Sequence, residues 1–120
     1  MSITATELEV LGCLGSEPEL LDRGVTWRYN EATYRVEVDG LLVTLVLAPS
    51  YSDVRLTVHR GEQRLYELDA RDVADVRVID EPGRDALEVE ISDELSLRMR
   101  LRPTFEITQG YTTAARTPWA

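Results

Sequence analysis

The sequence is poor in the residue types that most often carry chemistry. Its 120 residues include one cysteine, Cys13, one histidine, His59, and no lysine, so all 13 basic residues are arginine. A single cysteine allows no internal disulfide and no thiolate metal cluster. Because nothing indicates an oxidising compartment, we expect a cytoplasmic protein. Arginine without lysine is typical of GC-rich coding and indicates a bacterial source.

Long apolar runs are also missing. The longest, Leu41–Ala48, is interrupted by Thr44 and is far shorter than the roughly 20 residues of a membrane helix. The first 15 residues carry Glu7 and Glu9 and have no basic residue ahead of the apolar ones, unlike a secretory signal. A formal net charge of −9 adds repulsion from phosphate backbones and anionic lipids. We therefore expect a soluble protein that binds neither nucleic acid nor membranes.

What is present is enough for one folded domain. The composition is 43% hydrophobic and 29% charged, and a chain of this length buries enough surface to fold without a disulfide or a metal. We predict a single globular domain over residues 1–111 and a flexible C-terminal tail over residues 112–120.

Alternation of apolar and polar residues predicts β-hairpins. The clearest hairpin covers residues 33–48 around Asp39-Gly40, a strong two-residue turn signal. With that turn as the loop, Val38 pairs with Leu41, and the register gives one wholly apolar face.

The same alternation predicts further strands over residues 53–59, 63–68, 74–80, 85–91 and 95–101, with a last edge strand over 104–108. The predicted fold class is therefore α+β, mainly β. We expect one antiparallel meander of six or seven strands with a short N-terminal helix packed on one face. An all-β sandwich or a small barrel is the alternative.

The N-terminal segment predicts the helix. Three leucines recur at helical spacing: Leu8, Leu11 and Leu14. Thr4 and Glu7 have the form of a capping box, and Gly15 is suited to close the helix. A second short turn is expected over residues 19–22.

The predicted register also brings charged residues together. Glu88 would lie between Arg77 and Arg98 on the solvent face, an ordinary cross-strand charge row. Asp75 and Glu90 would face each other, and such a like-charge pair can raise the pKa of one carboxyl group. An enzyme that uses this acid pair is one alternative function, although 22 acidic residues make chance pairs common.

Acidic residues are concentrated between residues 67 and 94, where 11 acids and three arginines give −8 of the net charge of −9. Such a stretch can steer a basic partner, or it can serve solubility alone. We predict that nine of these acids form a protein-binding surface: Asp69, Asp72, Asp75, Asp80, Glu81, Asp85, Glu90, Asp93 and Glu94.

The sequence favours a non-enzymatic module that masks or neutralises a basic partner protein. It contains no Gly-x-Ser-x-Gly, His-Glu-x-x-His, phosphate-binding or dinucleotide-binding motif, so we expect no enzyme activity, no cofactor and no metal. A small acidic β-rich domain without a catalytic motif is similar in general character to bacterial effector-neutralising immunity proteins. Exposed sheet edges also allow a homodimer.

A carrier of a small ligand is the other alternative. Trp27 and Tyr29 alternate with Arg28 and would share one strand face, either in an apolar ligand pocket or as the edge of the core. Cys13 lies among apolar residues and His59 lies beside a turn. We therefore expect a buried thiol and a solvated imidazole rather than a catalytic pair.

Overall fold

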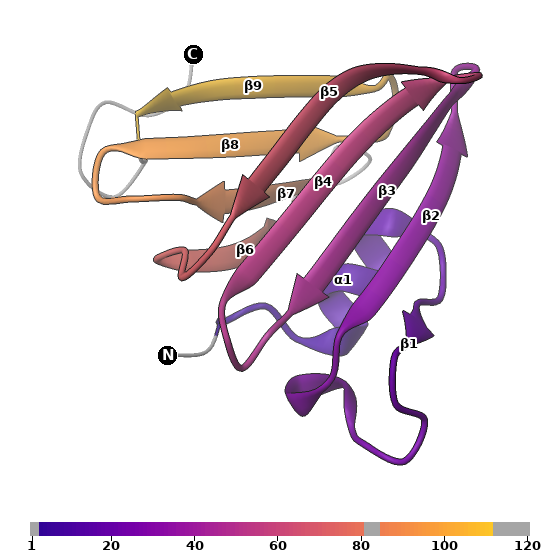
Figure 1. Cartoon of the computed structure of the whole chain (residues 1–120). Coiled ribbons are helices and arrows are strands. Elements are labelled where there is room, and N and C mark those ends of the chain that lie inside the picture. The colour runs from indigo at the N-terminus through magenta and orange to yellow at the C-terminus, as the bar shows by residue number, and fades with distance from the viewer. Residues whose placement is uncertain (1–2, 81–84, 112–120) are drawn as a thin grey trace.

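The computed structural model describes residues 3–80 and 85–111, which form two antiparallel sheets, one α-helix and one short 3-10 helix (Figure 1). The first sheet has the order β1-β2-β3-β4-β5 and the second has the order β6-β7-β8-β9. The strands of the first sheet are β1 (Glu19–Leu20), β2 (Ala32–Val38), β3 (Leu41–Ala48), β4 (Asp53–Arg60) and β5 (Gln63–Ala70). The strands of the second sheet are β6 (Asp75–Ile79), β7 (Ala86–Glu90), β8 (Leu95–Arg100) and β9 (Glu106–Tyr111).

The prediction of a single meander is wrong, because the chain leaves the first sheet after β5 and starts a second one at β6. The connection is fastened to the turn between β3 and β4: Asp72 N donates to Asp53 Oδ1 (3.0 Å), and Val73 N donates to Ser52 O (2.9 Å). Ser52 and Asp72 both have positive φ values, 58° and 53°. These local bends direct β6 away from the edge of β5. The alternation of apolar and polar residues within each hairpin does not reveal where such bends occur.

The hairpin registers are confirmed. Val38 pairs with Leu41 across Asp39-Gly40, and the predicted pairing continues along β2 and β3. In the second sheet Val76 pairs with Val89, which in turn pairs with Leu97. Alternation and turn chemistry therefore decide which residues face inward in each sheet.

The ends of the chain differ from the predictions. The last strand begins at Glu106, two residues later than expected, and pairs with β8. Residues 19–22 do not form a helical turn: Glu19 and Leu20 pair with Thr33 and Ala32 as the short strand β1. The predicted tail, 112–120, lies outside the described residues.

The predicted helix is α1 (Glu7–Leu14), but its cap and its buried face lie elsewhere. Thr6, not Thr4, is the N-cap: its side chain accepts from Glu9 N, and the Glu9 carboxylate accepts from Thr6 N. Gly15 ends the helix in the left-handed region at φ 68°, as predicted. Leu8 is 77% exposed, and the helix buries three other side chains: Val10, Cys13 and Leu14.

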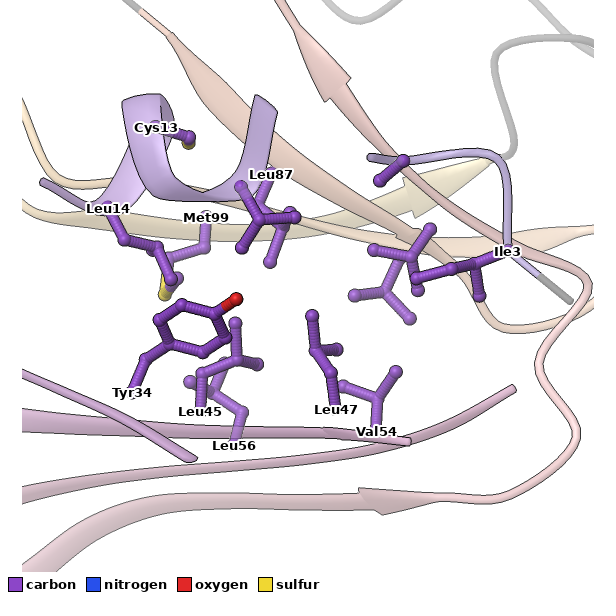
Figure 2. Packing of buried hydrophobic residues seen from close by; sticks show 14 of the residues in the cluster. Ile3, Cys13, Leu14, Tyr34, Leu45, Leu47, Val54, Leu56, Leu87 and Met99 are labelled. Atoms are coloured by element: carbon purple, nitrogen blue, oxygen red, sulfur yellow. The ribbon is translucent and has the colours of Figure 1, made fainter. Parts of the chain in front are cut away.

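The two sheets and α1 share one apolar core. Tyr34, Leu45 and Leu56 of the first sheet point toward Leu87 and Met99 of the second (Figure 2). α1 lies behind β2 and β3 in the view of Figure 1 and adds Cys13 and Leu14 to the same cluster. The core therefore occupies the space between the sheets, and the outer face of each sheet points away from it. Over the described ranges, no helix is long and apolar enough to span a membrane.

Candidate functional site

The acids predicted to bind a partner do not form one surface. Asp69 lies on β5 in the first sheet. Five others lie at the end of the second sheet where β6 starts and β7 ends: Asp72, Asp75, Glu90, Asp93 and Glu94. Asp80 and Asp85 lie at the opposite end, and Glu81 falls outside the described residues. The role of these acids in binding stays a prediction, and a single flat contact could reach only part of the set.

Asp75 and Glu90 face each other as predicted, but both interact with groups of this same chain. Asp75 Oδ1 accepts from Thr4 N and Asp75 Oδ2 accepts from Thr4 Oγ1, both at 2.8 Å. Arg77 lies between the two acids, with Nη1 3.6 Å from Asp75 Oδ2 and Nη2 3.5 Å from Glu90 Oε1. Arg77 therefore bridges the two carboxylates, and the enzyme that uses this acid pair stays a hypothesis.

Glu88 does not lie on a solvent face, which corrects the prediction. It is flanked by Arg77 and Arg98 as expected, but its exposure is 0%. Glu88 Oε1 accepts from Arg77 Nε at 2.9 Å, and Oε2 accepts from Arg98 Nη2 at 2.8 Å. Burial alone lowers the pKa of Arg77, but the bond with Glu88 and the nearby carboxylates raise it above its ordinary value. The charge row is therefore a buried ion network that belongs to the fold.

Trp27 and Tyr29 do not share a strand face, so that part of the prediction is wrong, while their role in ligand binding stays a prediction. They lie in a 3-10 helix, η1 (Trp27–Tyr29), with Trp27 buried and Tyr29 71% exposed. Trp27 Nε1 donates to Tyr34 Oη at 2.8 Å inside the core. The three-residue turn period replaces the alternation of a strand, and it sends the two rings in different directions.

An apolar groove of about 450 Å³ lies elsewhere, between β5 and β9. Its walls include Leu65 and Tyr66 of β5 and Phe105 and Ile107 near β9. Gln109 Nε2 donates to Tyr66 Oη at 2.9 Å across the gap between the two strands. This groove lies apart from Trp27 and Tyr29, the aromatic residues predicted for a ligand carrier.

The single cysteine and the single histidine are held apart. Cys13 is buried in α1; burial, with the charge of Asp85, raises the pKa of its thiol to about 11 against the opposing charge of Arg102. His59 lies on β4 beside Leu42 of β3 and Arg64 of β5. The burial of Cys13 agrees with the prediction, whereas His59 is half-buried rather than fully solvated.

A hollow of about 160 Å³ opens on the outer face of the first sheet, near the end where β2 begins and β3 ends. The registers place two rows of side chains there. One row runs Glu31, Ala48, Asp53, Arg71, and the other runs Thr33, Val46, Arg55, Asp69. Ala48 has the smallest side chain of its row and lies between Glu31 and Asp53. Because a methyl group fills little volume, the hollow opens at this position.

Local structure positions both of these acids. Asn30 is buried, and its side chain accepts from Asp22 N and Glu31 N while it donates to Val25 O. Leu21 N donates to Glu31 O at 3.0 Å, which continues the pairing of β1 with β2. Asp53 is held because its Oδ1 accepts from Asp72 N. Both carboxylates are thus presented from an ordered backbone.

The fold has a counterpart among solved structures. It is similar to a chain of the contact-dependent growth inhibition toxin–immunity protein complex from Klebsiella pneumoniae 342, with a TM-score of 0.75 and 20% sequence identity. The likeness covers 93% of this chain and 100% of that chain. No family model and no curated protein matches the sequence. The comparison therefore establishes the fold, and that fold occurs in a complex of a toxin with its immunity protein.

Of the residues that line the hollow, sequence reasoning singled out only Asp69, and it missed the central ones, Glu31, Ala48 and Asp53. Glu31 and Asp53 lie outside the acid-rich stretch, so a count of charges along the chain passes over them. The signal that could have found them is the hairpin register. Because Ala32 pairs with Leu47, one further step sets Glu31 beside Ala48.

Proposed function

We propose that this chain is an immunity protein, which binds a toxin protein and blocks its action without catalysing a reaction itself. The likeness to a chain of the Klebsiella pneumoniae toxin–immunity complex carries the proposal. Because it spans all of that chain and 93% of this one, the shared part is a whole domain rather than a common hairpin.

Composition and geometry support the immunity side of such a pair. A toxin that acts as an enzyme needs its own reacting groups in contact, whereas a blocking protein needs only a complementary surface. Here the only thiol is buried in α1, the only imidazole lies on the outer face of β4, and Asp75 and Glu90 are bridged by Arg77. The net charge of −9 favours a basic partner, with association that weakens as salt rises.

The test begins with the partner. The tagged full-length chain is captured from its own host lysate at low salt and again at high salt, and the bound protein is identified by mass spectrometry. That protein is then expressed in a test bacterium, alone or together with this chain. We expect growth to stop in the first case and to recover in the second.

An unrelated acidic protein of similar size, co-expressed in place of this chain, controls for a general effect of charge. Recovery of growth with that control as well would contradict a specific immunity role. So would a bound partner whose expression leaves growth unchanged, because a protein that does no harm needs no neutralisation.

A further inference from the structure

The hollow on the outer face of the first sheet is lined by charged side chains that form no ion pair among the described residues. Within the described part of the chain, no basic side chain lies within ion-pair distance of Glu31, Asp53 or Asp69, and no acid lies within that distance of Arg55 or Arg71. On the second sheet, in contrast, Arg77 and Arg98 pair with Glu88. The charges around the hollow are therefore among those that remain available for a partner.

The shape of the hollow selects among possible side chains. Glu31 and Asp53 lie on either side of Ala48, so their backbones are two strand spacings, roughly 10 Å, apart. A flat cationic group fits between two carboxylates at this spacing and can donate to both. Val46 and Ala48 are the apolar lining residues of β3, and they can pack against the stem of a long side chain.

We propose that this hollow receives an arginine side chain of the partner protein, with its guanidinium between Glu31 and Asp53. Arginine fits better than lysine because its planar fork can donate to two carboxylates at once while its stem packs on the sheet. Arg55 and Arg71 border the hollow on the β4–β5 side and confine the incoming cation to the β2–β3 side. This inference rests on the proposed function, and it names the surface that would dock the toxin.

Two exposed tyrosines lie close in sequence to the two acids of the hollow. Tyr51 is 73% exposed in the turn that joins β3 to β4, two residues before Asp53. Tyr29 is 71% exposed in η1, two residues before Glu31. Tyrosine is enriched among the residues that dominate binding energy at protein interfaces, and its ring also attracts guanidinium groups. The hollow and the two rings together fit an arginine-bearing protein surface.

The first test uses a small probe. Isotope-labelled chain is titrated with the peptide acetyl-Gly-Arg-Gly-amide, and the backbone amide signals are followed by NMR. We expect weak but saturable shifts centred on Glu31, Ala48 and Asp53, and none with acetyl-Gly-Gln-Gly-amide. Shifts spread over the acids of both sheets, or centred on Asp80 and Asp85, would overturn the assignment.

The second test uses two variants with matched controls and the toxin partner captured as described above. Glu31→Gln removes the charge, and Glu37→Gln removes the same charge from the other end of β2. Ala48→Leu fills the hollow without changing its charge, and Thr44→Leu places the same leucine side chain four residues away on that face of β3. Thermal unfolding confirms that all four variants fold.

For Glu31→Gln and Ala48→Leu we expect the dissociation constant for the partner to rise about tenfold or more, with the two controls changing it less than about threefold. Equal binding by all four variants would overturn the docking site while leaving growth rescue, and so the proposed function, intact. Conversely, saturable peptide binding at the hollow in a chain that rescues no growth would count against the immunity role alone.

Discussion

The two sheets of this protein use charge in opposite ways. On the outer face of the second sheet, Asp75, Glu88 and Glu90 all lie within ion-pair distance of Arg77, and Glu88 is buried. On the outer face of the first sheet, the acids around the hollow have no such partner among the described residues. Three acids of the acid-rich stretch are thus paired within the fold, whereas the acids around the hollow have no ion-pair partner among the described residues.

This difference teaches that net charge along a sequence does not locate a binding surface. A carboxylate can raise association rates only if solvent and partner can reach it. Asp75 and Glu90 belong to the acid-rich stretch, but their side chains are only 13% and 15% exposed. Glu31 lies outside that stretch and is exposed.

The largest expected effect comes from breaking the buried network of the second sheet. Glu88→Gln removes the buried carboxylate charge that both Arg77 and Arg98 contact. Removing one partner of a buried ion pair typically lowers the free energy of unfolding by about 3–5 kcal/mol. Urea unfolding followed by circular dichroism measures the change.

The matched variant on the first sheet is Glu31→Gln, for which we expect a change within about 0.5 kcal/mol because the side chain is exposed. Similar losses of stability for the two variants would show that the proposed contrast between the sheets does not exist.

A middle-sized effect concerns alkaline pH, because the thiol of Cys13 is buried in α1. The pKa of this thiol is raised from 9.0 to about 11, by burial first and by the charge of Asp85 second. When the pKa of an acid is higher in the folded protein than in the unfolded chain, the acid contributes to the free energy of unfolding at a pH below the unfolded-state pKa. This contribution is lost as the pH rises from the unfolded-state pKa through the folded-state pKa. We therefore expect a loss on the order of 2 kcal/mol between pH 9 and pH 11.

Cys13→Ala should remove this part of the pH dependence, leaving the contribution of Tyr34, whose pKa burial raises to about 12 despite its bond with Trp27. Urea unfolding of the parent and the variant across this range gives the two slopes. Identical slopes would mean that the thiol ionises equally in both states.

The sequence predicted the hairpins well because their determinants are local. The pairing of Val38 with Leu41 depends on Asp39-Gly40 and on a two-residue period, both visible in a short window. The same reasoning placed Glu88 between Arg77 and Arg98. It did not show that Glu88 is buried, because burial of an outer face depends on the whole fold.

What the sequence did not predict depends on long-range contacts. The change of sheet after Ala70 is fixed by bonds from Asp72 and Val73 to the turn before β4. The helix cap moved from Thr4 to Thr6 because Thr4 bonds to Asp75, a partner 71 positions away. Most of the candidate hollow was missed because it joins three separate segments, none of them unusual by itself.

The smallest expected effect concerns the ion pair between β1 and β2, which provides the counterpart to Glu88. Arg35 Nη1 lies 3.3 Å from Glu19 Oε2, with side-chain exposures of 56% and 79%. Water screens such a pair, and ordering two long side chains offsets much of the attraction. A double-mutant cycle of Arg35→Gln and Glu19→Gln should give a coupling below about 0.5 kcal/mol that falls further in 1 M salt. A coupling as large as the stability loss expected for Glu88→Gln would mean that an exposed ion pair can stabilise the fold as much as a buried one. The contrast between the two sheets would then have to be abandoned.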